Sequence, residues 1–317
     1  MQQDWRPNAS QAARRLRAQL YKTIRDFFDQ RDVLEVDTPI LSSGASTDPM
    51  LDHLSCINTG QSYYLQTSPE FAMKRLLAAE SGSIYQICRC FRAGESGRRH
   101  NPEFTMLEWY RTDFSLQQLI DEIVCLLQHW FPQRVARDYD YEELITQHTG
   151  LNYDSSSIED IRNYLSSNSA SYSIELLQGR RDDLFDLIFS SEIEPTLGID
   201  NIAIMTNYPA SQAQFAELSN CGNHAKRFEV YINGIELANG YEELADSNEQ
   251  AMRFAQHNEQ RIALSKPAIS VDQRLLSALT HGLPQCSGVA LGLDRLLMLV
   301  ADLESLDQVL EFSLDRA

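Results

Sequence analysis

The sequence has neither paired cysteines nor long apolar runs. No two of its six cysteines form a Cys-x-x-Cys pair; they stand at Cys56, Cys88, Cys90, Cys125, Cys221 and Cys286. This spacing gives no sign of a zinc site or a dithiol redox motif, and it predicts reduced thiols. No stretch approaches the roughly 20 apolar residues that cross a bilayer, and residues 1–7 lack the apolar core of a secretory signal. We therefore expect a cytoplasmic protein with no membrane partner.

Positive charge is also scarce. The 317 residues include 27 Lys and Arg against 45 Asp and Glu, which gives a formal net charge of −18. Phosphate neutralisation supplies most of the affinity of non-specific nucleic-acid binding, so this balance disfavours such binding, although a local basic patch stays compatible with it. Hydrophobic residues make up 43% of the chain, which is enough for a sizeable core.

Periodic patterns indicate an α+β protein. Apolar residues that recur at steps of three and four predict a helix at 12–28. Further helices are predicted at 116–131, at 246–264, which is polar, and at 293–303, which is apolar. Ser68 is expected to cap a further helix with Pro69 at its first position. Strands are predicted at 63–66, 84–92 and 104–111, the last two as an antiparallel hairpin. Without βαβ alternation, we expect an antiparallel sheet flanked by helices, in one domain over 1–317 with a peripheral insertion around 140–200.

A second hairpin is predicted at Asn233-Gly234, a favoured two-residue turn. With this turn, Val230 faces Leu237 on an apolar face. The other face carries Glu229 and Glu236 as diagonal neighbours, roughly 6–8 Å apart. Two carboxylates without a basic partner repel unless a cation lies between them, and Mg²⁺ suits such a pair. The alternative is a solvated face with two unrelated glutamates.

The strand at 104–111 places one carboxylate among apolar neighbours. Phe104, Met106, Glu108 and Tyr110 share a face because side chains alternate along a strand. An ionisable residue is unusual on such a face. It predicts the wall of a pocket for a cation, with Phe104 available to stack on a planar ring. The alternative is an edge strand from which Glu108 reaches water.

Small residues mark a strand-to-helix junction near the C-terminus. Gly288, Ala290 and Gly292 alternate there, and Arg295 follows one turn into the helix. Glycine lets backbone approach a ligand closely, and a helix N-terminus favours anionic groups. The Walker phosphate loop and the dinucleotide fingerprint are both absent, so this segment predicts a different kind of anion site.

Taken in order, these segments resemble the three signature motifs of class II aminoacyl-tRNA synthetases, and they are most similar to the lysine branch. Residues 34–41 resemble motif 1, which in that family builds the dimer interface. Residues 91–105 resemble motif 2, and residues 288–295 resemble motif 3. The segments 67–70 and 236–243 are similar to substrate-site segments of lysyl-tRNA synthetases.

Because the chain begins almost directly at the motif 1 helix, we expect no anticodon-binding domain. A stand-alone core of this length resembles the elongation factor P β-lysine ligase family, above all in residues 101–110, 227–240 and 286–292. The resemblance implies ATP-dependent activation of (R)-β-lysine as an adenylate and its transfer to a lysine ε-amine of elongation factor P. It further implies a homodimer that uses Mg²⁺ and no tRNA.

The resemblance also implies residue roles, with Arg92 on the α-phosphate and Arg295 on the γ-phosphate as the catalytic pair. It implies an ATP site at Arg92, Ala93, Gly94, Glu95, Asn101, Phe104, Glu236, Leu237, Gly292 and Arg295. It implies a substrate site at Ser68, Pro69, Glu70, Glu108, Tyr110, Glu243 and Ala290. Glu108, Tyr110 and Glu243 match the ε-ammonium site, and Glu70 the site of the other amine. Glu229 and Glu236 match the Mg²⁺ ligands.

Two departures from the synthetases carry expectations of their own. Ala93-Gly94-Glu95 stands where lysyl-tRNA synthetases have Asn-Glu, and Glu95 is expected to take over the adenine contact. Ala290 stands where they have glycine, and its methyl group is expected to disfavour α-lysine. Arg98 and Arg99 are candidates for steering an acidic protein partner, with contact to solvent or ATP phosphates as the alternative.

Two other functions stay open. One is a truncated lysyl-tRNA synthetase core, or an asparagine-synthetase-like relative, that serves another acceptor. The acidic residues of the substrate site favour a diamine over a dicarboxylate. The other is a non-catalytic paralogue that binds an amino acid or a partner. Such proteins lose a motif arginine or a metal carboxylate, whereas Arg92, Arg295, Glu229 and Glu236 are all present here.

Overall fold

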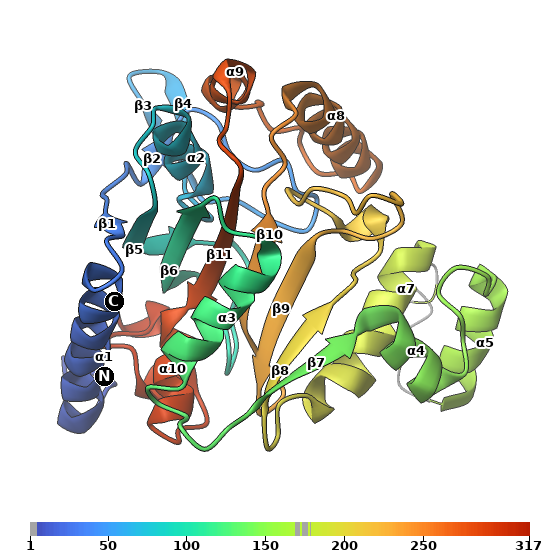
Figure 1. Cartoon of the computed structure of the whole chain (residues 1–317), viewed down its shortest axis with the longest axis horizontal. Helices are drawn as coiled ribbons and strands as arrows, with labels where there is room; N and C mark the ends of the chain where they lie inside the picture. The colour runs from blue at the N-terminus through green and yellow to red at the C-terminus, as the bar shows by residue number, and fades with distance from the viewer. Residues whose placement is uncertain (1–4, 169–171, 173–176, 178) are drawn as a thin grey trace. The chain divides into compact units, whose positions relative to one another are not determined.

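The computed structural model describes residues 5–168, 172, 177 and 179–317 (Figure 1). The chain divides into two compact units. Unit 1 comprises Met1–Leu119 with Glu242–Ala317, and unit 2 comprises Ile120–Tyr241. The single domain expected over 1–317 stays a prediction. Among the described residues, no helix combines the length and the apolar character that a bilayer crossing demands.

Unit 1 contains a four-stranded part of the main sheet, in the order β1-β5-β6-β11. These strands are β1 (Leu34–Glu35), β5 (Ile84–Phe91), β6 (Glu103–Thr112) and β11 (Cys286–Gly292). β1 pairs with β5 in parallel, and the other two pairs are antiparallel, which confirms the hairpin expected at 84–111. A smaller antiparallel sheet has the order β2-β4-β3. Its strands are β2 (Leu41–Ser42), β3 (Ser55–Asn58) and β4 (Gln61–Leu65).

The helices of unit 1 pack on its strands and on one another (Figure 1). They are α1 (Gln11–Asp29), α2 (Glu70–Ala78), α8 (Ser247–Ala263), α9 (Gln273–His281) and α10 (Leu293–Val300). α1 follows its Ser10 cap and buries Phe28, whose ring stacks on Tyr85 with centroids 4.4 Å apart. α10 contacts α1 as well as β6, so the segment after β11 is anchored to the core.

Three predicted helix ends were wrong. α2 begins at Glu70 with Pro69 in the capping position, one residue later than expected, although the Ser68 hydroxyl still accepts a hydrogen bond from the Glu70 N–H. α3 (Leu116–Leu127) ends before residue 131, and the residue before a proline, here Phe131, disfavours helix. α10 ends before residue 303 because Asp302 has a left-handed φ of 52°.

Unit 2 contains strands in the order β10-β9-β8-β7. They are β7 (Ala136–Asp140), β8 (Ile202–Thr206), β9 (Arg227–Ile232) and β10 (Ile235–Glu242), and only β7–β8 is a parallel pair among them. The helices are α4 (Tyr141–Thr149), α5 (Ile158–Asn168) and α7 (Arg181–Ile188). They share one apolar core with β8 and β9, so much of the segment around 140–200 packs on the strands of its unit. The α+β class is confirmed.

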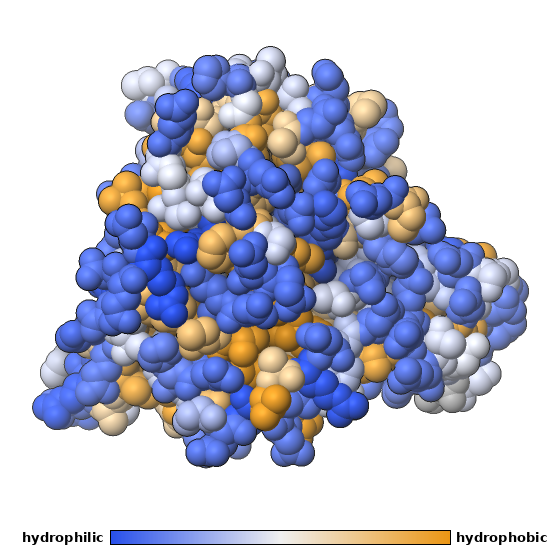
Figure 2. Space-filling view, viewed as in Figure 1, coloured by the Kyte–Doolittle hydropathy of each residue, from blue (hydrophilic) through white to orange (hydrophobic). Residues whose placement is uncertain are grey.

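The surface agrees with the acidic, polar composition. On the face drawn in Figure 2, hydrophilic residues cover most of the surface and hydrophobic ones show in smaller groups.

Candidate active site

A buried carboxyl group lies at the centre of an acidic cluster in unit 1. Glu108 on β6 is only 2% exposed, and it accepts hydrogen bonds from the Ser68 hydroxyl and the Tyr110 hydroxyl, both at 2.7 Å. Burial and then the negative charge of Glu70 raise the pKa of Glu108 to about 8. A cation that binds next to such a carboxyl group lowers its pKa, and so stabilises the ionised carboxylate. The predicted edge-strand alternative for Glu108 was wrong.

Two further carboxylates of the cluster share a buried ammonium group. The Lys74 Nζ lies 2.7 Å from Glu70 Oε1 and 2.6 Å from Glu243 Oε2. Burial alone lowers the pKa of Lys74, but Glu243 and Glu70 raise it above its usual value. Burial raises the pKa of Glu243 to about 7 against the opposing charge of Lys74. The cluster therefore holds three carboxyl groups and one internal cation.

β11 contacts this cluster through a glycine. A Cβ atom at Gly288 would lie 2.3 Å from the Tyr110 ring and 2.6 Å from Glu243 Oε1. No side chain fits there without displacing these groups, so the backbone of β11 lies directly against them. Two residues on, Ala290 is the cross-strand partner of Glu108. The methyl group of Ala290 is therefore on the same face of the sheet as the central carboxyl group.

Arg92 and Phe104 form a second group in unit 1. The Arg92 guanidinium carbon lies 5.1 Å from the Phe104 ring centroid, and its Nη1 lies 3.7 Å from Glu95 Oε1. The Arg92 Nε is buried and has no hydrogen-bond partner in the structure. A buried guanidinium nitrogen without an acceptor is costly, and a phosphate oxygen would satisfy it.

Arg295 on α10 meets the loop between β5 and β6. Its Nη2 lies 2.7 Å from His100 Nε2, and its Nε donates to the Arg99 carbonyl at 3.3 Å. Burial and the charge of Arg295 lower the pKa of His100, so the imidazole is neutral near pH 7. Since a guanidinium can only donate, His100 Nε2 is the acceptor and the proton sits on Nδ1. The predicted motif 2 arginine, Arg92, is thus the first residue of this loop, and the predicted motif 3 arginine, Arg295, contacts the loop from α10.

The remaining ATP-site candidates lie around the same loop or on β10. The Asn101 amide donates to the Glu103 carbonyl at 2.6 Å, which orders the start of β6. Ala93 N–H donates to the Asp52 carbonyl, and Gly94 adopts a left-handed φ of 79°. Gly292 caps α10, and the next residue but one, Asp294, accepts a 2.6 Å hydrogen bond from Thr105 N–H.

The hairpin of β9 and β10 differs from its predicted register. The turn at Asn233-Gly234 is confirmed, but a bulge between Glu236 and Ala238 leaves Val230 opposite Ala238. The predicted pairing of Val230 with Leu237 was wrong, because alternation gives no warning of an inserted residue. Glu236 still stands opposite Tyr231, and Asn239 stands opposite Glu229.

Glu229 is buried in a dense hydrogen-bond network, which makes the predicted solvated face wrong. Its Oε1 contacts the Arg227 guanidinium and accepts from Asn239 at 3.2 Å, while its Oε2 accepts from the Tyr208 and Tyr231 hydroxyls. Burial lowers the pKa of Arg227, but the charge and hydrogen bond of Glu229 together with Tyr241 and Tyr208 raise it above its usual value. The prediction that Glu229 lacks a basic partner was therefore wrong, because Arg227 pairs with it.

These contacts limit how Glu229 can hold a metal ion. Four donors occupy the acceptor capacity of the carboxylate. Asn239, at 3.2 Å, makes the longest of the four contacts to this carboxylate, so Oε1 is the atom that can exchange a donor for Mg²⁺. Glu236 is half-buried on the same side of the ribbon. In the described part of the chain, no three His, Cys, Asp or Glu side chains form a metal-binding cluster, so such an ion would rely on phosphate and water oxygens as well.

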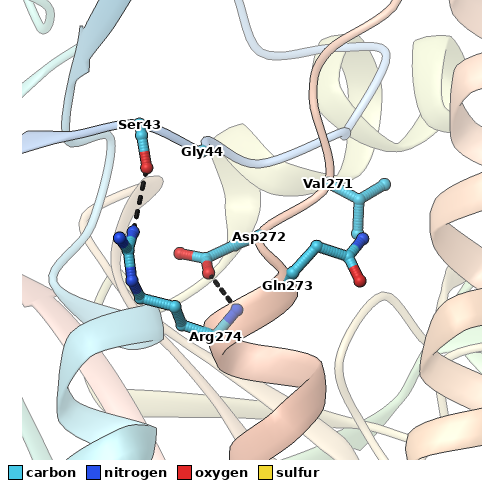
Figure 3. Close-up of a pocket in the computed structure, with 6 residues that line it drawn as sticks. All are labelled: Ser43, Gly44, Val271, Asp272, Gln273 and Arg274. Atoms are coloured by element: carbon cyan, nitrogen blue, oxygen red, sulfur yellow. Dashed lines mark hydrogen bonds between the residues drawn. The ribbon is translucent and has the colours of Figure 1, made fainter.

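A separate cavity of about 370 Å³ lies elsewhere in unit 1, between the loop after β2 and the start of α9 (Figure 3). Arg274 donates to the Ser43 hydroxyl at 3.0 Å, and Asp272 caps α9. Gly44 lies so close that a Cβ there would be 2.9 Å from the Asp272 Cβ. None of the predicted site residues lines this cavity.

Three residues that contact the predicted site residues were not predicted from the sequence. Lys74 follows Glu70 by four residues on a helix, a spacing that could have indicated the pair. Arg227 precedes Glu229 by two on a strand and so shares its face. Asn239 had no such signal, because its position opposite Glu229 depends on the bulge.

Comparison with known proteins gives consistent matches. The tRNA synthetases class II (D, K and N) family matches residues 2–316. The elongation factor P–(R)-β-lysine ligase of Hamiltonella defensa is 45% identical, over 99% of this chain and 98% of that protein. The proteins of the same name from Proteus mirabilis and Photobacterium profundum are each 43% identical, over 99% and 100% of this chain and 98% and 100% of their own lengths. The chain therefore belongs to the class II tRNA synthetase family, within its elongation factor P–(R)-β-lysine ligases.

Proposed function

We propose that this protein activates (R)-β-lysine with ATP and transfers the β-lysyl group to a lysine ε-amine of elongation factor P. The observation that carries the proposal is the acidic cluster of Glu70, Glu108 and Glu243, in which Lys74 pairs with Glu70 and Glu243. Three acids with one internal cation leave an excess of negative charge, which suits a diamine and repels a dicarboxylate.

Within this proposal, Glu108, Tyr110 and Glu243 bind the ε-ammonium group of the substrate, and Glu70 binds its other amine. Ser68 and Pro69 shape the same wall, and the Ser68 hydroxyl holds Glu108 in place. The Ala290 methyl group beside Glu108 selects β-lysine over α-lysine by shape.

ATP is proposed to bind with its adenine on Phe104 and its phosphates on the two arginines. Arg92 Nε is buried and has no hydrogen-bond acceptor among the described residues, which supports a role on the α-phosphate. Arg295, held by His100, would bind the γ-phosphate. Further contacts are proposed at Ala93, Gly94, Glu95, Asn101, Glu236, Leu237 and Gly292.

The chemistry needs positioning more than proton transfer. The substrate carboxylate attacks the α-phosphorus, a new C–O–P bond forms, and pyrophosphate leaves; the arginines stabilise the negative charge that develops on the phosphates. The acceptor amine then attacks the adenylate carbonyl, an amide forms, and AMP leaves with the amine proton passing to its phosphate. Mg²⁺, which Glu236 and Glu229 Oε1 would hold, supplies charge neutralisation of the phosphates.

The proposal includes a cytoplasmic homodimer that acts on a protein acceptor and not on tRNA. The formal net charge of −18 supports the absence of a nucleic-acid partner. The match of residues 34–41 to motif 1 supports the dimer.

The decisive experiment is ATP–pyrophosphate exchange with (R)-β-lysine, (S)-β-lysine and α-lysine, followed by intact-mass measurement of elongation factor P. We expect the fastest exchange with (R)-β-lysine and a mass gain of one lysyl residue on elongation factor P. Exchange without a mass gain would favour another acceptor, and no exchange with any of the three would contradict the proposal.

A further inference from the structure

The buried position of Lys74 calls for an explanation beyond folding. Its side chain is fully enclosed on α2, with 1% of the residue exposed. Taking an ammonium group out of water is costly, and a buried ion pair is often no more stable than apolar residues of the same volume. A methionine could fill this position without that cost. The charge is therefore explained best by what it does to Glu70 and Glu243.

The charges of the cluster can be counted. With Glu70, Glu108 and Glu243 ionised, Lys74 leaves two net negative charges, whereas without it there would be three. A diamino acid presents two ammonium groups. Three neighbouring titratable groups add no charge, because their pKa is raised: burial does this for Tyr110 and Cys286, and the Cys88 hydrogen bond and burial do it for Cys90. Asp113 also acts on Cys286, and Arg92 acts on Cys90.

We propose that Lys74 is a positioning residue for the diamine: it holds Glu70 and Glu243 in place and sets the net charge of the cluster to match two substrate ammonium groups. This inference rests on the proposed function, since the match presupposes a diamino acid. Lys74 is anchored on the helix that carries Glu70, so it fixes the two carboxylates before the substrate arrives. Preorganised carboxylates lose less entropy on binding than mobile ones.

The test compares Lys74→Met, which removes the charge at similar length, with Lys74→Arg, which keeps it. Lys22→Met is the matched control, because Lys22 forms the same helical i,i+4 pair with Asp26 at 2.8 Å but is exposed. The readout is the KM for (R)-β-lysine and for ATP in pyrophosphate exchange, from pH 6.5 to 9.

Lys74→Met should raise the KM for (R)-β-lysine at pH 7 by about 10-fold or more while the KM for ATP changes less than about 2-fold. The defect should shrink as pH rises, because without Lys74 the acids hold protons that the diamine must displace. Lys74→Arg should stay within about 3-fold of wild type, and Lys22→Met should not differ from it. A pH-independent loss, or equal rises in both KM values, would mean that Lys74 is merely structural.

Proton release from the wild-type protein gives a second test that needs no variant. Calorimetry of (R)-β-lysine binding at pH 8, in buffers of different ionisation heat, should show the release of one proton at most, from Glu108. Release of two or more would show that Lys74 does not keep Glu70 and Glu243 ionised, and would overturn the inference. If the wild-type protein catalyses pyrophosphate exchange and Lys74→Met does so with an unchanged KM for (R)-β-lysine, the inference about Lys74 is wrong but the proposed function stands. If the wild-type protein catalyses no exchange, the proposed function is wrong too.

Discussion

At the scale of single residues, the buried carboxyl group of Glu108 is surrounded by hydrogen-bond donors that the fold holds in place. Glu108 is held by Ser68 and Tyr110 in a geometry that suits either protonation state, since a carboxylate accepts from both hydroxyls and a carboxyl group still accepts from at least one. Its pKa of about 8 keeps a proton on it at neutral pH until a cation approaches. This arrangement makes its charge dependent on the substrate.

Glu108→Gln tests that role. The amide keeps the shape but cannot become anionic, so the KM for (R)-β-lysine should rise roughly 10- to 100-fold, the range of about 1.5–3 kcal/mol for a hydrogen bond to a charged group. In the wild-type protein the affinity for the diamine should increase from pH 6 to 8 as Glu243 and Glu108 ionise, and the variant should lose the part above about pH 7 that belongs to Glu108. Glu103→Gln on the same strand, where the side chain is exposed, is the control. An unchanged pH profile in Glu108→Gln would contradict the assignment.

Ala290→Gly tests selectivity at the neighbouring position. Removing one methyl group beside Glu108 should increase the kcat/KM for α-lysine relative to (R)-β-lysine, by roughly 10-fold if the group is worth the usual 1–3 kcal/mol of discrimination. The ratio is measured by pyrophosphate exchange with each amino acid. If the ratio does not change, Ala290 has no part in selectivity.

At the scale of elements, the hairpin of β5 and β6 joins the two groups of site residues in unit 1. Phe104 stands at its start beside Arg92, and Glu108 stands further along the same strand. The loop that connects the strands contacts α10 through Arg295 and His100. A displacement of this loop would therefore reach both arginines of the proposed ATP site.

The exposed arginines of that loop give a prediction of their own. Charge reversal at Arg98 and Arg99 should slow modification of elongation factor P by about 10-fold at low salt and by less at high salt, because steering of charged partners is screened. Adenylate formation should be spared, since Arg295 contacts the backbone carbonyl of Arg99 and not its side chain. Intact-mass time courses measure the first effect and pyrophosphate exchange the second. Arg137→Glu on β7 controls for added negative charge, and an equal fall in both rates would exclude a docking role.

At the scale of the whole molecule, several buried acids hold protons that the unfolded chain would release. Burial is the main cause that raises the pKa of Asp186 to about 6, of Glu243 to about 7 and of Glu108 to about 8. Below about pH 6.5 this is opposed by His53, His100 and His257, whose pKa burial lowers, because the unfolded chain protonates them more readily. Between about pH 7 and 8 the acids dominate, so the free energy of unfolding falls as pH rises through that window.

Chemical unfolding at a series of pH values should show this fall, by up to about 1.4 kcal/mol per pH unit for each group involved. The decline should level off above about pH 8.5, once Glu108 is ionised in both states. Glu108→Gln should remove its share of the slope, mainly between pH 5 and 8. A stability that rises with pH between 7 and 8 would show that Glu243 and Glu108 are ionised in the folded protein.

The sequence by itself determined the elements, the faces of β6 and β9, and the acidic character of the substrate site. These follow from local rules, since alternation along a strand and periodicity along a helix are properties of the backbone. That is why Glu108 and Tyr110 were assigned to one face correctly, and why the turn at Asn233-Gly234 was predicted. The matched motifs added the family, because their order along the chain is itself a sequence property.

Only the tertiary structure decided which charges meet. Lys74 reaches Glu243 because α2 packs beside the segment after β10, and no local pattern gives that pairing. Arg295 meets His100 in the same way, across two segments far apart in the chain. The bulge that sets Asn239 opposite Glu229 also lay beyond the alternation rule. Contacts between distant segments depend on how whole elements pack, and packing is the outcome of all their side chains together.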